Sequence, residues 1–198
     1  MAEVSDEQLL GSWRAGDRTA GDLLVQRYFD PICRFFRSKL GDDVEDLIQR
    51  TFLDCAERRD QIQLGLFRAY LFAVARNRLF DHLRSVMARP IAIDLSEVSL
   101  ADLGTSPSQR VAKNERQKML MLALARLPLD QQIVLELAYW EGLSGPEIAH
   151  VIGVEPNTVR SRLARAREAL RSELEHATAS PRDTHETLEE FERGGCRS

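Results

Sequence analysis

The chain has 198 residues, a net charge of −4 and 43% hydrophobic residues, with 27 basic and 31 acidic side chains. This length suits one large or two small domains, and the composition excludes an intrinsically disordered protein. The acidic balance excludes a protein that coats nucleic acid through bulk charge. Because only 7% of the residues are aromatic, we expect helical cores rich in leucine, isoleucine, valine and alanine.

Sequence features typical of enzymes, metal sites and membrane proteins are lacking. The three cysteines, Cys33, Cys55 and Cys196, are far apart and no Cys/His metal spacing occurs, so we expect no metal ion, cofactor or disulfide framework. The four histidines are scattered and no nucleophile or phosphate loop is present, so we expect no enzyme. A signal-peptide pattern and a membrane-spanning apolar run are also lacking, so we expect a cytoplasmic protein without membrane insertion.

Residues 5–87 are expected to form a first helical domain. Within it, Pro31 is predicted to begin a helix that ends at the turn Gly41–Asp43. The helix after this turn has apolar residues at helical spacing on one face. The polar residues that face away from it are Asp46, Gln49 and Arg50.

The middle and the end of the chain differ in composition from these helices. Residues 88–113 contain two prolines, a glycine and frequent serine and aspartate, and we expect a mobile linker there. A second helical domain is predicted over residues 114–175. Residues 176–198 are polar and acidic, and we expect them to form a disordered tail.

The stretch Gly142–Leu170 has the features of a helix-turn-helix. Ser144 and Glu147 have the spacing of a capping box, which marks the start of a short helix. Gly153 suits the left-handed residue that ends this helix, and Pro156 suits the first turn of the next one. In that second helix, apolar residues recur at the spacing of a buried seam. They are Val159, Leu163, Ala166 and Leu170.

Arginines are concentrated on the second helix of this motif. Residues 156–171 contain five arginines and one acidic residue, in a chain that is acidic overall. Because arginine grips guanine edges or phosphates and a helix of this size fits the major groove, we predict a DNA-reading helix. The alternative is a solvated, arginine-rich surface helix of a bundle. The residues predicted to face the bases are Arg160, Ser161, Ala164 and Arg165, while Arg162 and Arg167 touch phosphates or stay in solvent.

Three strings in the chain occur in an order that resembles one protein family. They are "DDVEDLIQRTFLDCAERRD", "FRAYLFAVARNRLFDHLR" and "LPLDQQIVLELAYWEGLSGPEIAHVIGVEPNTVRSRLARAREAL". Their order is similar to that in a bacterial RNA polymerase sigma factor of the extracytoplasmic-function (ECF) group. The resemblance covers about residues 8–90 and 115–172. It implies two small all-α domains joined by a flexible linker, the second ending in a helix-turn-helix, and a role in transcription initiation.

The resemblance also implies a partner for each domain. The helix over Asp43–Asp60 would dock on the clamp helices of the largest subunit of core RNA polymerase, through the three polar residues named above. The segment Asp60–Leu83 would read and melt the −10 promoter element, and the arginine helix would read the −35 element. Phe72 suits the apolar core as well as it suits DNA. The residues implied for the −10 element are Arg68, Phe72, Arg76, Asn77 and Arg78.

An autonomous helix-turn-helix regulator, whose first domain senses a signal or dimerises, is the alternative to a sigma factor. Such a regulator binds its operator unaided, whereas a sigma factor binds core polymerase and is weak on promoter DNA alone. The acidic balance favours the sigma factor. Members of this family are commonly held inactive by an anti-sigma protein, which is a further partner that the resemblance implies. Control by the acidic tail, acting in cis as a decoy for the arginine helix, is the other possibility.

Overall fold

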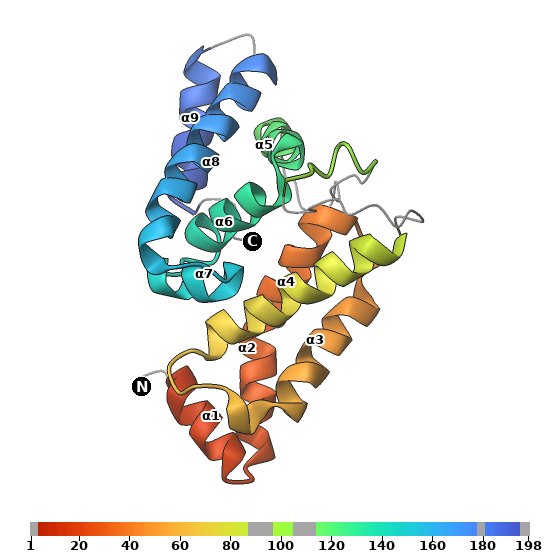
Figure 1. The fold of residues 1–198 in the computed structure, drawn as a ribbon, viewed down its shortest axis with the longest axis vertical. Coiled ribbons are helices and arrows are strands. Elements are labelled where there is room, and N and C mark those ends of the chain that lie inside the picture. The colour runs from red at the N-terminus through yellow and green to blue at the C-terminus, as the bar shows by residue number, and fades with distance from the viewer. Residues whose placement is uncertain (1–3, 87–96, 105–113, 178–180, 195–198) are drawn as a thin grey trace. The chain divides into compact units, whose positions relative to one another are not determined.

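The computed structural model describes residues 4–86, 97–104, 114–177 and 181–194, and every regular element in them is a helix. The chain divides into two compact units, one of residues 1–36 and 44–88 and one of residues 37–43 and 89–198. The all-α fold expected from the sequence is confirmed. In chain order the helices are α1 (Asp6–Arg14), α2 (Arg18–Leu40), α3 (Glu45–Glu57), the short 3₁₀ helix η1 (Arg59–Gln61), α4 (Phe67–Val86), α5 (Glu115–Arg126), α6 (Leu129–Tyr139), α7 (Gly145–Ile152), α8 (Pro156–Ala177) and α9 (Pro181–Glu192) (Figure 1).

The first unit is built from α1 to α4 around an apolar core. Helix α1 begins at a capping box, in which the side chains of Ser5 and Gln8 each accept a hydrogen bond from the other residue's backbone N–H. Helices α3 and α4 pack on each other. Arg78 of α4 donates two hydrogen bonds, of 2.6 and 2.7 Å, to the carboxylate of Asp54 on α3. This bidentate pair fixes the register of the two helices that carry the predicted polymerase and −10 residues.

Helix α2 continues through Pro31, where the sequence predicts that a helix begins. That prediction is wrong, because packing outweighs the local cost of proline. A proline inside a helix removes one backbone hydrogen bond and costs about 3 kcal/mol. Ile32, Phe35 and Phe36 directly follow it and are buried, and each such side chain contributes roughly 1.5–3 kcal/mol on burial. The helix ends where predicted, since Gly41 has a positive φ of 85°.

The helix-turn-helix forms in the second unit as the sequence predicts. Ser144 and Glu147 complete the capping box of α7, with the Ser144 N–H donating to the Glu147 carboxylate at 2.8 Å. Gly153 ends α7 with φ 69° and ψ 42°, a left-handed conformation that a side chain would strain. Helix α8 then begins at Pro156.

One stripe of α8 is buried along most of the helix. Val159, Ala166 and Leu170 are buried, and Leu163 is partly buried against the same cluster. Leu174 is buried as well and extends the stripe by another turn. Helices α5, α6 and α7 all pack on α8. The seam predicted from the spacing of apolar residues is therefore confirmed, and it leaves the opposite side of α8 exposed.

Part of the expected linker packs on the second unit. Residues 97–104 lie at the junction of α5 and α6, where the Leu129 N–H donates to the Val98 carbonyl and the Ala101 N–H to the Ala125 carbonyl, both at 3.0 Å. Leu100 is buried between these contacts. The expectation of a mobile linker is wrong for this segment, because one leucine and two backbone hydrogen bonds anchor it. Residues 87–96 and 105–113 of the expected linker lie outside the described residues.

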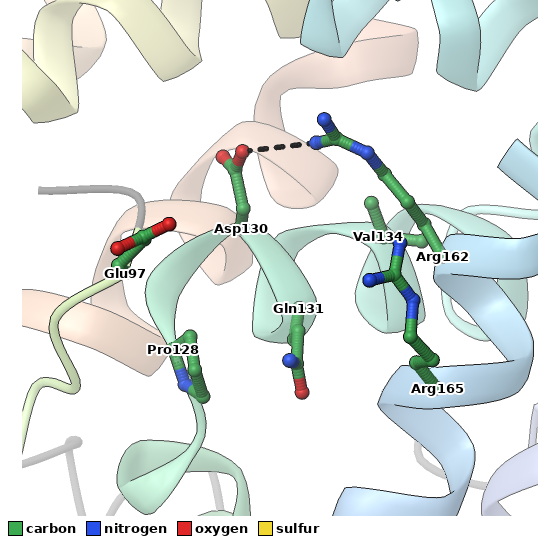
Figure 2. A pocket seen from close by; sticks show the side chains of 7 residues that line it. All are labelled: Glu97, Pro128, Asp130, Gln131, Val134, Arg162 and Arg165. Atoms are coloured by element: carbon green, nitrogen blue, oxygen red, sulfur yellow. Dashed lines mark hydrogen bonds and ion pairs between the residues drawn. The ribbon is translucent and has the colours of Figure 1, made fainter. Parts of the chain in front are cut away.

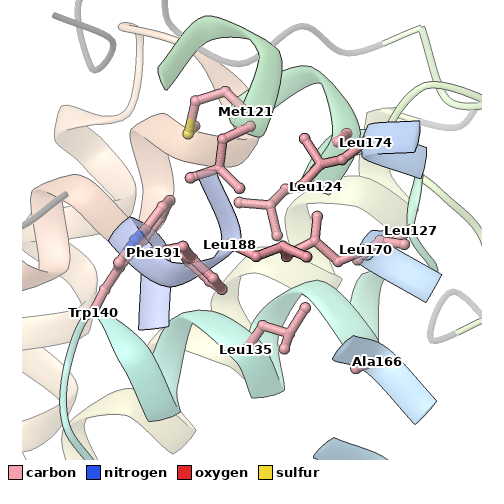
Figure 3. Close-up of a cluster of buried hydrophobic side chains, with 12 residues drawn as sticks. Met121, Leu124, Leu127, Leu135, Trp140, Ala166, Leu170, Leu174, Leu188 and Phe191 are labelled. Carbon is pink, nitrogen blue, oxygen red and sulfur yellow. The ribbon is translucent and has the colours of Figure 1, made fainter. Parts of the chain in front are cut away.

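Helix α9 forms within the stretch that the sequence analysis expects to be disordered. It packs on α8 and α5 (Figure 1), and its Phe191 is 1% exposed. The Phe191 ring lies 5.7 Å from Trp140 and 5.2 Å from Tyr139, measured between centroids. Figure 3 shows Phe191 and Leu188 directed into the cluster formed by α5, α6 and α8. The buried stripe of α9 consists of two threonines, a leucine and a phenylalanine. Because only two of these residues are apolar, the sequence pattern of the segment does not indicate a buried face. The four residues are Thr184, Thr187, Leu188 and Phe191.

We predict that Phe191→Ala destabilises the second unit by about 3–5 kcal/mol, because it leaves a cavity among aromatic and leucine side chains. The exchange rates of the protected α8 amides measure the free energy of opening of this unit, and they should rise in the variant. Leu122→Ala is the control: Leu122 is 57% exposed on α5, and its truncation should change stability by no more than about 0.5 kcal/mol. Equal exchange rates in the two variants would show that α9 is not part of this core.

Candidate nucleic-acid interface and docking helix

The exposed side of α8 carries the predicted base-reading residues. Arg160, Ser161, Ala164 and Arg165 are all exposed, and they lie opposite the buried seam. The Ser161 hydroxyl donates to the Thr158 carbonyl at 2.9 Å, which holds this side chain along the helix. Arg160 has no ion-pair partner among the residues that the structure describes. The helix therefore presents a small, partly cationic face of the kind that enters a major groove.

Two other arginines of α8 are held by carboxylates of the same unit. Arg162 lies 3.3 Å from the carboxylate of Asp130 on α6, and Arg167 lies 2.6 Å from that of Glu192 on α9. The structure thus separates the six predicted residues into two groups. Four lie on the open face, and two are flanking arginines already engaged within the protein.

A cavity of about 440 Å³ opens beside the exposed face of α8 (Figure 2). Arg162 and Arg165 contribute guanidinium groups to its wall, while Glu97 and Asp130 contribute carboxylates. Figure 2 shows Arg162 directed at Asp130 across this space. Because the opposite charges are matched in number, the cavity lacks the net charge that would select an ionic ligand. Its remaining lining residues are Pro128, Gln131 and Val134.

Phe72 belongs to the core of the first unit and does not face DNA. Its side chain is 0% exposed, and its ring meets that of Phe35 edge-on with centroids 5.9 Å apart. The prediction that Phe72 contacts the −10 element is therefore wrong. Phe72 has helical spacing to Arg68 and Arg76, but α4 has buried residues on more than one side, and a large apolar side chain there is buried in preference to the arginines.

The other predicted −10 residues of α4 have different surroundings. Asn77 is exposed, whereas Arg68, Arg76 and Arg78 are half-buried. The guanidinium of Arg76 stacks over the Phe80 ring at 4.4 Å from its centroid, and Arg78 is held by Asp54. A cavity of about 200 Å³ lies beside Asn77 and Arg78. Its other lining residues are Asp54, Arg58, Tyr70, Val74 and Asp81.

The predicted docking residues lie together on the outer face of α3. Asp46, Gln49 and Arg50 are exposed, and Arg50 donates a hydrogen bond of 3.0 Å to the Asp46 carboxylate one turn earlier. Leu53 lies on the same stripe and is 52% exposed. Leu53 is not among the docking residues predicted from the sequence, because apolar residues in a helix are expected to be buried. The only sequence signal is its spacing of four from Gln49 and seven from Asp46.

An aromatic pair adds to the apolar surface near Leu53. Phe29 of α2 is about half exposed, and its ring stacks on that of Phe52 with centroids 6.4 Å apart and an interplanar angle of 15°. Exposed large apolar residues that adjoin polar ones are typical of a protein-binding surface. The outer side of α3 therefore combines charged, amide and apolar groups, which is the composition that a docking helix requires.

The described part of the chain contains two cysteines. Cys33 and Cys55 are both buried and form no disulfide, and burial raises the pKa of the Cys55 thiol to about 12, so it forms no thiolate at neutral pH. The described residues contain no cluster of histidine, cysteine and carboxylate groups that is able to hold a metal ion. Nor do they include a helix with the length and apolarity needed to cross a membrane.

Comparison with known proteins agrees with this arrangement. The model of Sigma-70 region 2 matches residues 24–89, and the model of Sigma-70 region 4 matches residues 117–170. The ECF RNA polymerase sigma factor SigM of Mycobacterium tuberculosis is 31% identical over 171 residues, which cover 85% of this chain and 84% of SigM. RNA polymerase sigma factor NccH of Alcaligenes xylosoxydans xylosoxydans is 30% identical over 177 residues, which cover 86% of this chain and 95% of NccH.

A solved structure shows that the fold is shared. The sigma factor RpoE, in complex with the anti-sigma factor NepR from Bartonella quintana, matches with a TM-score of 0.59 and 23% identity, over 78% of this chain and 96% of RpoE. Both sigma regions, the helical fold and relatives that align over most of their length point to one conclusion. The chain belongs to the sigma-70 family of RNA polymerase sigma factors, in its ECF group, and it is an initiation factor that binds RNA polymerase and directs it to promoters.

Proposed function

We propose that α8 reads the −35 element. The observation that supports this assignment is the exposed face of α8. The buried seam fixes the rotation of α8, so that Arg160, Ser161, Ala164 and Arg165 point outward together. Arg160 and Arg165 then supply the bidentate donors that distinguish guanine, and Ala164 leaves room for a thymine methyl group. Arg162 and Arg167 lie at the flanks of this face, where DNA phosphates line the groove.

The first unit carries the other two tasks in this proposal. The outer face of α3 docks on the clamp helices of the largest polymerase subunit through Asp46, Gln49 and Arg50, with Leu53 as an apolar anchor. Small apolar groups surrounded by polar ones are the usual source of binding energy in such interfaces. The polymerase thereby brings an acidic protein to DNA that its own charge would repel.

Helix α4 engages the −10 element in this proposal, with a smaller set of residues than the sequence implied. Arg68, Arg76 and Asn77 remain candidates for contact with unstacked bases and backbone, because cationic and amide groups suit a melted strand. Arg78 positions α4 on α3 through Asp54 and so acts on the helix instead of on DNA. Phe72 supports α4 from the core.

An anti-sigma protein is a further partner in this proposal. Support comes from the solved RpoE structure, in which a sigma factor of the same fold is bound to the anti-sigma factor NepR. An autonomous regulator with a sensor domain is not favoured, since the first unit matches the second sigma region over its main helices.

We expect Arg160→Ala and Arg165→Ala to weaken promoter-specific transcription while binding to core polymerase stays intact. Each loss should amount to about 1–3 kcal/mol if the arginine grips a base, and should be independent of sequence if it holds only phosphate. Run-off transcription on templates with wild-type and altered −35 elements measures this. Arg126→Ala on α5 is the control, because Arg126 pairs with Glu173 away from the reading face. Normal transcription by both α8 variants at every template would refute the assignment.

We expect Leu53→Ala to weaken binding to core polymerase by about 1–2 kcal/mol, because it removes an apolar anchor from the docking face. Its effect on folding should stay within about 0.5 kcal/mol, since half of the side chain is in solvent. Changes at Asp46 and Gln49 should lower transcription from all promoters alike. Titration of labelled protein with core enzyme measures the affinity, and Leu122→Ala, an equally exposed leucine on α5, is the control. The docking assignment fails if the two leucine variants bind core enzyme equally well.

A further inference from the structure

Helix α9 is an acidic element attached to the reading helix, and it lies outside both matched sigma regions. The region 4 match ends at residue 170, and α9 covers Pro181–Glu192. Burial of Phe191 and Leu188 holds α9 against α8 and α5. Because Phe191 directly precedes Glu192, the packing of one residue sets the position of the next residue's carboxylate.

Ion pairs join α9 to both α8 and α5. One carboxylate oxygen of Glu192, Oε1, lies 2.8 Å from Nε and 2.6 Å from Nη2 of Arg167, so it accepts along the side edge of the guanidinium. Glu186 contacts Arg116 of α5 at 2.6 Å. Carboxylate and phosphate oxygens both accept hydrogen bonds from the N–H groups of arginine. Glu192 therefore engages two N–H groups of Arg167 that a phosphate oxygen would also use.

The position of Arg167 makes this competition relevant to DNA. Arg167 lies three residues after Ala164, which places both on one side of α8. A cavity of about 190 Å³ lies between the two helices, lined by Ala164, Arg167, Glu168 and Arg171 of α8 and by Leu188 and Glu192 of α9. Helix α9 thus flanks the reading face at the edge where phosphates border the major groove. About half of the Arg167 side chain remains exposed, so a phosphate is able to approach it.

We propose that α9 withholds Arg167 from the DNA backbone, and that Glu192 lowers the sequence-independent affinity of the reading helix for DNA. The inference rests on the proposed role of α8 in DNA reading. The helix remains docked by Phe191 while its carboxylate exchanges with phosphate, so no unfolding of the tail is required. The result is a reading helix that depends more on base contacts and less on charge.

The test compares Glu192→Gln with Glu189→Gln in the full chain. Glu189 is exposed on α9, where it pairs with His185 of that helix and with Arg193 just after its end, so both changes remove one charge from α9 but only the first frees Arg167. The probe is a short duplex of unrelated sequence, and fluorescence anisotropy measures its affinity between about 50 and 200 mM salt, a range over which phosphate contacts weaken strongly.

We expect Glu192→Gln to raise the affinity at low salt roughly two- to fivefold, the range typical of one exposed ion pair. The plot of log K against log salt should steepen by about 0.9, the value for one added phosphate contact. Glu189→Gln should behave as the wild type does. Adding Arg167→Ala to Glu192→Gln should abolish the gain.

The proposal is overturned if Glu192→Gln matches the wild type, if both glutamine variants gain equally, or if none of the proteins binds the duplex. Equal gains would show that bulk charge is responsible. Failure of the promoter-reading assignment would be seen separately, as normal transcription by the Arg160 and Arg165 variants. The two results are independent, because the salt dependence concerns a contact that carries no sequence information.

Discussion

The second unit depends on one constraint: α8 has to bury one stripe completely while keeping the opposite side open to solvent. Val159, Ala166, Leu170 and Leu174 satisfy the first requirement, and α5, α6, α7 and α9 all pack around them. Ala166 is small, so neighbouring helices approach α8 closely at its middle. Because the buried stripe fixes the rotation of the helix, it also decides which side chains face outward. The exposed arginines are therefore positioned by apolar packing on the far side of their own helix.

The same division of surfaces explains the first unit. Helix α4 carries both cationic residues and large aromatic ones, and the aromatic ones are needed for the core that holds α4 in place. Phe72 is buried, and Arg78 is committed to Asp54 on α3. The residues of α4 that stay accessible are consequently fewer than the set that the family resemblance implies. On α3 the reverse holds, since Leu53 is an apolar residue that the fold leaves exposed.

Charge is organised locally in this acidic chain. Ion pairs near the surface contribute little to stability, typically about 0–1 kcal/mol. The partly exposed pairs Arg162–Asp130 and Arg167–Glu192 therefore matter less for folding than for keeping these two arginines from binding other anions. They flank a face on which Arg160 and Arg165 stay accessible. A protein that polymerase brings to DNA does not need a strong sequence-independent electrostatic affinity for phosphates. Neutralising the flanking arginines within the unit is consistent with that requirement.

The sequence alone determined the all-α class, the helix-turn-helix with its capping box, glycine turn and proline start, the buried seam of α8 and the outer face of α3. These features follow from contacts between residues a few positions apart, which a sequence pattern records directly. The tertiary structure decided the continuous α2 at Pro31, the core position of Phe72, the anchoring of Leu100 and the docking of α9. Each of these depends on burial against residues distant in the chain. Phe191 shows the reason most clearly. Two threonines share its buried stripe, so the local sequence is polar. The helix is held in place because the Phe191 ring packs against Tyr139 and Trp140, which are distant in the chain.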